Sequence, residues 1–193
     1  GGNDNDSLTG GSGNDTFNVD AGIDSIEDLG GTGAANEDDV LIVSNSATVN
    51  ATNIIKFVST NASKNEGTAN LTAKSSGGHI DMTLSTAGAY TITGSASTDT
   101  LIAGTGNDTL QITSAGDGNS DTMDGGSGSD TLKLASGSNI FSDNNKLKNI
   151  ETIVANASGS SVTLTGQSES FTITGGAGID TIIGGSGVDT ITG

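Results

Sequence analysis

Hydrophobic residues along this chain occur in short runs that alternate with small polar residues and are separated by glycine-rich segments. The alternation is clearest in YTIT (90–93), VTLT (162–165) and FTIT (171–174), and it is typical of β-strands that bury one face. The stretches near 40–93 and 134–174 are therefore predicted to form strands. The segment KLKNIETIV (146–154) fits a short helix or a strand, and its β-branched end favours a strand.

A nine-residue unit repeats through the glycine-rich segments. Nine copies align, and in all of them the sixth residue is Asp, the seventh is Ser or Thr, and the eighth is a large apolar residue. The copies begin at residues 1, 10, 19, 94, 103, 116, 125, 175 and 184. The eighth residues, which are expected to point into a core, are Leu8, Phe17, Ile26, Leu101, Leu110, Met123, Leu132, Ile182 and Ile191.

The first half of each unit combines glycine with aspartate, which is the chemistry of a cation-binding turn. Glycine permits positive φ, so a short loop can turn tightly and direct several carbonyl oxygens at one point. Together with an Asp carboxylate, these carbonyls are the hard oxygen ligands that Ca²⁺ prefers. The candidate carboxylates are Asp6, Asp15, Asp24, Asp99, Asp108, Asp121, Asp130, Asp180 and Asp189.

The units resemble the RTX calcium-binding nonapeptide GGxGxDxUx, in which U is a large aliphatic residue. The resemblance implies an all-β fold, a right-handed parallel β-roll or β-solenoid with two nonapeptides in each turn. It also implies several Ca²⁺ ions, each bound between loops that lie one turn apart. The backbone carbonyls implied as further ligands are those of Gly2, Gly11, Gly13, Gly22, Gly104, Gly106, Gly126, Gly128, Gly176, Gly178, Gly185 and Gly187.

The implied turn of two nonapeptides decides which loops of the first group share an ion. Asp6 and Asp24 are separated by the length of two nonapeptides, as one turn requires. The position two nonapeptides after Asp15 is Gly33, in a stretch where the pattern is loosened. The alternative partner of Asp15 is Asp39, through an enlarged loop.

Four residues, 112–115, interrupt the phase of the second group of units. Asp99 is therefore expected to pair with Asp121, and Asp108 with Asp130, each across two nonapeptides plus this insertion. The strand after Asp108 is expected to absorb the extra residues, so that two ion sites remain in this group.

The units fall into three groups, and metal-free β spacers connect them in what is expected to be one continuous solenoid. In the third group, Asp180 and Asp189 have no motif aspartate one turn upstream, and they are predicted to form half-sites. The expected segments are calcium block one (1–42), a spacer (43–93), calcium block two (94–134), a second spacer (135–174) and a truncated calcium block three (175–193).

The composition restricts both the fold and the partners. Aromatic residues make up 3% of the chain and glycine 31 of its 193 residues, so a thin, repetitive core is expected in place of a wide globular one. The formal charge of −17 repels phosphates and anionic membranes, so nucleic acid is excluded as a partner and bound cations are favoured. No apolar run approaches the length of a membrane-spanning helix, roughly 18 residues or more, so no membrane insertion is expected.

The sequence offers little support for catalysis. His79 is the only histidine, neither HExxH nor G-x-S-x-G occurs, and the chain is expected not to be an enzyme. Cysteine is absent, which excludes disulfides and thiolate metal sites, and the chain opens without the apolar segment of a signal peptide. An ice-binding threonine face is disfavoured because the T-x-T strands are few and separated.

The interrupted RTX groups and their Thr/Ser/Asn-rich spacers resemble bacterial S-layer proteins and large RTX adhesins. The resemblance implies a structural segment of a type I-secreted, extracellular bacterial cell-surface protein that folds when Ca²⁺ binds outside the cell. The partners it implies are calcium, identical subunits in a surface lattice and cell-surface polysaccharide. The alternatives are a C-terminal RTX accessory module of a secreted protease or lipase, and the repeat region of a toxin.

Overall fold

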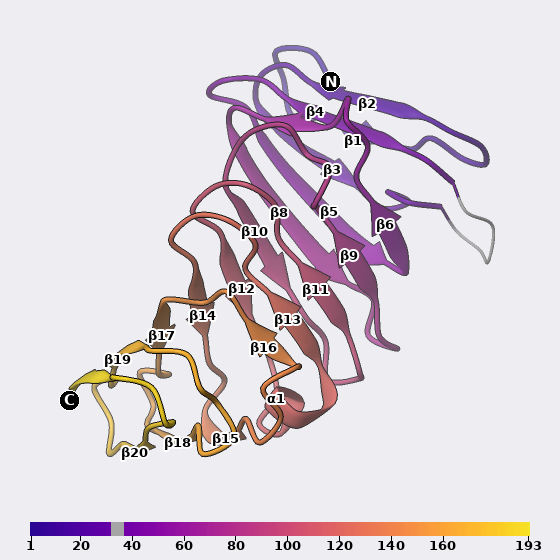
Figure 1. Ribbon diagram of the computed structural model, residues 1–193. Coiled ribbons are helices and arrows are strands. Elements are labelled where there is room, and N and C mark those ends of the chain that lie inside the picture. Colours follow the sequence, from indigo (N-terminus) through magenta and orange to yellow (C-terminus); the bar gives the residue numbers. More distant parts are fainter. Residues whose placement is uncertain (32–36) are drawn as a thin grey trace.

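The computed structural model describes residues 1–31 and 37–193, and all strand pairs in these residues are parallel. Figure 1 shows the chain winding as a stack of strands from the indigo N-terminus to the yellow C-terminus. One ten-stranded sheet follows the whole stack. Its strands are β1 (Ser7–Leu8), β3 (Ile23–Ile26), β5 (Thr48–Ile54), β8 (Thr68–Ala73), β10 (Tyr90–Thr93), β12 (Thr109–Gln111), β14 (Thr131–Lys133), β17 (Thr152–Val154), β19 (Thr172–Thr174) and β21 (Thr190–Thr192).

Three shorter sheets form the other sides of the stack. The first contains β2 (Thr16–Val19), β4 (Val40–Val43) and β7 (Lys64–Asn65). The second contains β6 (Lys56–Val58), β9 (His79–Asp81), β11 (Thr100–Ile102), β13 (Thr122–Asp124) and β16 (Leu147–Lys148), and the third contains β15 (Gly137–Ile140), β18 (Ser160–Thr163) and β20 (Thr181–Ile183). The chain is therefore a parallel β-solenoid, or β-roll, in which the strands of the spacers join the same long sheet as those of the calcium blocks.

The length of a turn varies along the solenoid. Neighbouring strands of the ten-stranded sheet lie two nonapeptide lengths apart in the pairs β1–β3, β10–β12 and β19–β21, as the RTX pattern implies. The intervals between the other neighbouring strands of this sheet are all longer. Two of these turns carry two strands outside the ten-stranded sheet, β6 and β7 between β5 and β8, and β15 and β16 between β14 and β17, because one side sheet ends where another begins.

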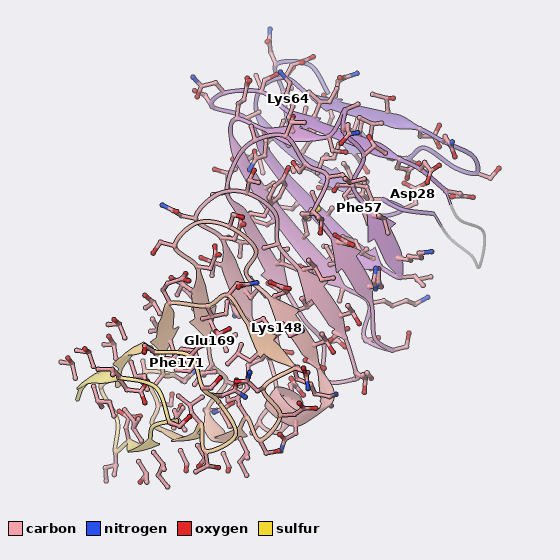
Figure 2. The ribbon with its side chains drawn as sticks, viewed as in Figure 1. Asp28, Phe57, Lys64, Lys148, Glu169 and Phe171 are labelled. Carbon is pink, nitrogen blue, oxygen red and sulfur yellow. The ribbon has the colours of Figure 1, made fainter. Side chains whose placement is uncertain are left out.

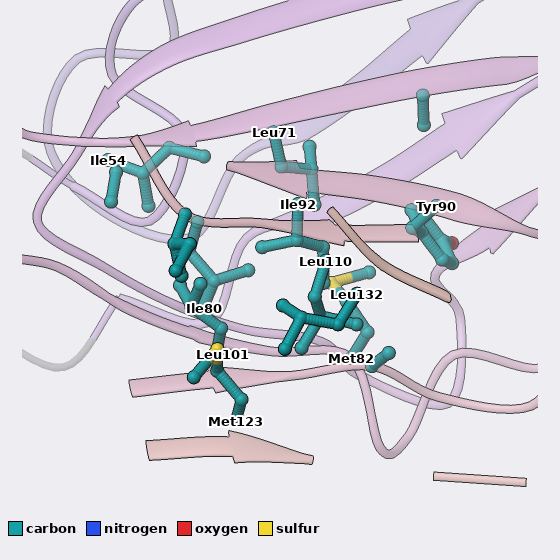
Figure 3. Close-up of a cluster of buried hydrophobic side chains, with 14 of the residues drawn as sticks. Ile54, Leu71, Ile80, Met82, Tyr90, Ile92, Leu101, Leu110, Met123 and Leu132 are labelled. Carbon is teal, nitrogen blue, oxygen red and sulfur yellow. The ribbon is translucent and has the colours of Figure 1, made fainter. Parts of the chain in front are cut away.

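Each turn contributes inward side chains to one continuous core. The row inside the ten-stranded sheet consists of Leu8, Ile26, Ala51, Leu71, Ile92, Leu110, Leu132, Ile153, Ile173 and Ile191. Figure 3 shows Leu71, Ile92 and Leu110 of this row clustered with residues of the five-stranded sheet, among them Ile80, Leu101 and Met123. The predicted inward position of the eighth residue is confirmed for the six units in which this residue is buried; Leu8 and Ile182 are partly buried, and Ile191 is 49% exposed.

Small polar residues occupy the outward row of the ten-stranded sheet. From β10 to β21 this row consists of Thr91, Thr109, Thr131, Thr152, Thr172 and Thr190. Threonines that are far apart in the sequence are thus neighbours on the surface, because each turn returns the chain to the same sheet. Their sequence separation is therefore no argument against a regular threonine face, although β propensity alone accounts for threonine on a strand.

The only helix of the described residues is the single turn α1 (Asp117–Ser120), inside the unit that begins at Gly116. It lies between β12, which ends at Gln111, and β13. The expectation that the strand after Asp108 would absorb the four extra residues is wrong, because these residues lie in the connection that leads into α1. No helix among the residues that the structure describes is long and apolar enough to cross a membrane.

Candidate metal sites

The motif aspartates close their own loops with backbone hydrogen bonds. In five units, Oδ2 accepts the N–H of the residue four positions earlier, which ties the start of the loop to its end. The N–Oδ2 distances are 2.8 Å for Gly2 and Asp6, 2.6 Å for Ser95 and Asp99, 3.3 Å for Gly104 and Asp108, 2.9 Å for Gly176 and Asp180, and 2.9 Å for Gly185 and Asp189. The carboxylates are thus held in position by the loop that carries them.

Glycines of successive loops lie directly against one another. Gly106 and Gly128 have φ values of 150° and 142°, and a Cβ on Gly128 would overlap the carbonyl oxygen of Gly106. Ser127 joins the two loops, because its carbonyl accepts the N–H of Gly106 (2.9 Å) and its N–H donates to the carbonyl of Gly104 (3.0 Å). Glycines proposed to supply carbonyl ligands therefore lie at the contact between loops one turn apart, where an ion shared by two turns would have to bind.

Four pairs of aspartates are connected across one turn by a hydrogen bond of the same kind. In each pair the backbone N–H of the upstream Asp donates to Oδ1 of the downstream Asp. The N–Oδ1 distances are 3.0 Å for Asp6 and Asp24, 2.9 Å for Asp15 and Asp39, 2.9 Å for Asp99 and Asp121, and 2.7 Å for Asp108 and Asp130. The structure thus brings together all the pairs that the sequence suggested for the first two blocks.

The partner of Asp15 is supplied by an enlarged loop. Gly33, the position two nonapeptides after Asp15, lies outside the described residues. Asp39 closes its loop by accepting the N–H of Gly30 at 2.8 Å, and it is 2% exposed. An insertion between the glycines and the aspartate therefore preserves the pairing.

Within two of the pairs the second carboxylate oxygens converge on one point. A Cβ on Gly94 would lie 3.1 Å from Oδ2 of Asp99 and 3.7 Å from Oδ2 of Asp121. A Cβ on Gly1 would lie 2.8 Å from Oδ2 of Asp6 and would overlap Oδ2 of Asp24. Only a residue without a side chain leaves this space open, so the glycine at position 1 of the upstream loop frames a cradle between two carboxylates.

Three of the carboxylate oxygens in this arrangement have no hydrogen-bond partner. They are the buried Oδ2 atoms of Asp24, Asp121 and Asp130, each on the downstream aspartate of a pair. Burying a carboxylate oxygen without a partner is costly, and a hard cation removes that cost. The residues present therefore fit Ca²⁺.

Burial also changes the proton affinity of these groups. Removal from water, reinforced by neighbouring carboxylates, raises the pKa of Asp121 and of Asp130 to about 6. Burial likewise raises the pKa of Asp108 and of Asp39. Without a cation these loops therefore hold a proton more tightly than exposed carboxylates do, whereas a bound divalent cation favours the charged form.

This electrostatic arrangement predicts opposite pH dependences for the calcium-free and calcium-bound forms. The pKa of Asp121 and Asp130 is higher in the fold than in the unfolded chain, so the folded form binds more protons between about pH 4 and pH 6. The calcium-free fold should therefore lose stability as the pH rises through this window, while calcium affinity should increase. Thermal unfolding of resin-treated, calcium-free protein and calcium titrations at several pH values measure the two trends. Calcium-free stability that rises with pH would contradict the prediction.

Asp180 and Asp189 are not paired with an upstream carboxylate. Their Oδ1 atoms accept the N–H groups of Ser160 (2.8 Å) and Phe171 (3.0 Å). Among the described residues, Asp180 and Asp189 thus meet backbone N–H groups of the upstream turn and no second carboxylate there, as expected of half-sites.

Asp28 is a structural carboxylate that the sequence analysis missed. Its side chain is 7% exposed, and its two oxygens accept the N–H groups of Gly10 (3.2 Å) and Gly11 (2.8 Å). Figure 2 shows Asp28 near the N-terminal end of the solenoid. Asp28 lies outside the sixth position of any unit, and only its distance of two nonapeptides from Gly10 could have indicated the contact.

Comparison with known families agrees with this geometry. A family model described as RTX calcium-binding nonapeptide repeat (4 copies) matches residues 1–26, 86–111, 115–142 and 172–193, more than half of the chain. The chain belongs to the RTX calcium-binding repeat family. Neither a search of curated proteins nor a search of solved structures found a match.

Membership of the RTX family identifies calcium as the ion of these repeats. Two side-chain carboxylates and several carbonyls make up each proposed RTX site, so no larger carboxylate cluster is needed. Accordingly, the described residues contain no group of three or more His, Cys, Asp or Glu side chains placed to hold a metal. The bound ion would supply the positive charge, and the RTX loops of this chain would supply its oxygen ligands.

Proposed function

We propose that this chain is a non-catalytic, load-carrying segment of a type I-secreted bacterial surface protein of the S-layer or adhesin kind. The observation that supports this most directly is that the calcium loops and the spacers between them share one ten-stranded sheet and one core. Such a continuous stack behaves as a rod, whose stability depends on contacts between neighbouring turns. A rod of this kind suits a scaffold that spans distance outside the cell.

The proposed mechanism couples export to folding. With a formal charge of −17 and carboxylates paired across the turns, the calcium-free chain repels itself. Cytosolic calcium is too scarce to fill sites of the affinity usual for extracellular modules, roughly 10⁻⁴ to 10⁻³ M. The chain would therefore be exported unfolded and would fold outside, where the free energy of calcium binding becomes free energy of folding.

The proposed partners follow from the same surface. An acidic rod with outward rows of Thr, Ser and Asn can approach identical subunits through bridging Ca²⁺, or cell-surface polysaccharide through its hydroxyl and amide groups. His79 stacks between Lys56 and Thr100 in an outward row, a position consistent with a surface residue of a scaffold.

Cell fractionation with an antibody against this chain tests the proposal. The protein is expected in the surface fraction of intact cells, and washing with a calcium chelator should release or unfold it, whereas the same chelator saturated with calcium should not. Detection of the folded chain in the cytoplasm would contradict export in the unfolded state. A catalytic domain in the same polypeptide, with the chain dispensable for surface assembly, would contradict the scaffold role.

A further inference from the structure

The row of carboxylates that begins in the second calcium block continues into the spacer. Thr131 pairs with Thr152 in the sheet, so Asp130 and Glu151 occupy the same position one turn apart. The backbone N–H of Asp130 donates to Oε2 of Glu151 at 2.7 Å. A hydrogen bond of the same kind connects each of the four aspartate pairs. Glu151, however, belongs to none of the nine units.

Asp130 presents a buried oxygen that its own loop does not use. In the preceding loop of this row, the N–H of Gly104 closes onto Oδ2 of Asp108. The equivalent N–H of Gly126 donates instead to Oδ1 of Asp124, at 3.0 Å. Asp130 is 1% exposed, and its Oδ2 has no hydrogen-bond partner. A group other than the loop's own amide must therefore satisfy this oxygen.

A carbonyl oxygen from the next turn converges on the same place. A Cβ on Gly125 would lie 2.7 Å from Oδ2 of Asp130 and would overlap the carbonyl oxygen of Asn149. These two oxygens thus border one cradle, as the paired oxygens do beside Gly94. The glycine leaves the space between them open.

The backbone of Asn149 is held in an unusual conformation that presents this carbonyl. Its φ is +52°, in the left-handed region that non-glycine residues visit rarely. Asn149 is held there by its N–H, which donates to Oε1 of Glu169 (3.2 Å), and by its Nδ2, which donates to Oδ1 of Asp124 (2.7 Å). Figure 2 shows Glu169 toward the C-terminal end of the solenoid. A positive φ is also found at glycines of the calcium loops, such as Gly126 (φ 88°).

We infer that Asp130, Glu151 and the carbonyl of Asn149 bind a further divalent cation of the calcium class, outside the nonapeptide motif. The two carboxylates and the carbonyl provide the hard, partly anionic oxygen set that such an ion requires. The ion would join the last loop of the second block to the first turn of the following spacer. This inference deepens the proposed function and rests on calcium binding by the neighbouring loops.

Calcium titration of the whole chain by isothermal calorimetry, with metal analysis of the dialysed protein, tests this site. Glu151→Gln is expected to shift one calcium equivalent to about tenfold higher calcium concentration, the effect of losing one charged ligand contact. Glu151→Ala, which removes every side-chain oxygen, should abolish that equivalent. Glu66→Gln, which changes an exposed acid of the other spacer, is the matched control and should leave the isotherm unchanged.

The outcomes separate this site from calcium binding as a whole. If the isotherms of Glu151→Gln and Glu151→Ala coincide with that of the wild type, the Asp130–Glu151 site is wrong. The assignment of calcium to the four aspartate pairs would not be affected by that result. A wild-type chain that binds no calcium would overturn the proposed function itself. Circular dichroism at saturating calcium verifies that each variant folds, so a lost equivalent in a folded variant supports the site.

Discussion

Chelation of calcium is expected to unfold the whole solenoid at neutral pH. A ligand that binds only the folded state adds RT ln(1 + [L]/Kd), which is about 1.4 kcal/mol per site at ten times Kd. Four aspartate pairs then contribute about 6 kcal/mol, which is comparable to the whole stability of a typical domain, about 5–15 kcal/mol. Without the ions, the stacked carboxylates also repel one another, so the thin core is not expected to hold the chain folded.

Circular dichroism and small-angle scattering during a calcium titration measure this transition. We expect an expanded coil in chelator and a β-rich rod in millimolar calcium, with magnesium unable to substitute at equal concentration. Asp108→Asn should raise the calcium midpoint clearly more than Asp189→Asn, because Asp108 is paired with Asp130 whereas Asp189 is paired with no aspartate among the described residues. A β-rich spectrum that persists in chelator would contradict calcium-dependent folding.

The sequence predicts the calcium blocks well because their chemistry and their geometry have the same period. Each turn brings the sixth residues of two units together, so the turn length implied by the RTX resemblance, with the four-residue insertion added, was enough to suggest the pairs Asp99–Asp121 and Asp108–Asp130. The inward position of the eighth residue follows from strand alternation alone. Where a unit departs from the motif, as in α1, the pairing still holds because the neighbouring strands fix the register.

The spacers are harder to predict because their turns have no fixed length. Glu151 contacts a calcium loop across one turn at a separation of 21 residues, which differs from the length of two nonapeptides. Glu151 lies in no unit, so only the strand register identifies its neighbour. The turns in which one side sheet gives way to the next, with β6 and β7 or with β15 and β16, carry no motif that could announce the change. Successive turns also bring six threonines that are far apart in the sequence into one outward row of the ten-stranded sheet. The order of residues along the chain does not reveal this row.

The narrow core makes single large side chains unusually important, and Phe57 is the clearest example. Phe57 is fully buried on β6, where it stacks on Ile80 of the next turn, and Figure 2 shows it in the N-terminal half of the solenoid. Phe57→Ala is expected to destabilise the calcium-bound form by about 3–5 kcal/mol. For a chain of this length, that lowers Tm by on the order of 10 °C.

Val58→Ala provides the matched control, because Val58 follows on the same strand and is half-exposed. It should change Tm only slightly, since substitutions outside the core usually fall within about 0.5 kcal/mol. In a stack whose turns contact only their neighbours, the damage should also be local. Hydrogen exchange of Phe57→Ala at saturating calcium should increase in the turns around β6 and β9 and remain near wild type around β14 and β17. Equal effects of the two variants on Tm, or a uniform loss of protection, would show that the solenoid does not draw its stability from this one-dimensional core.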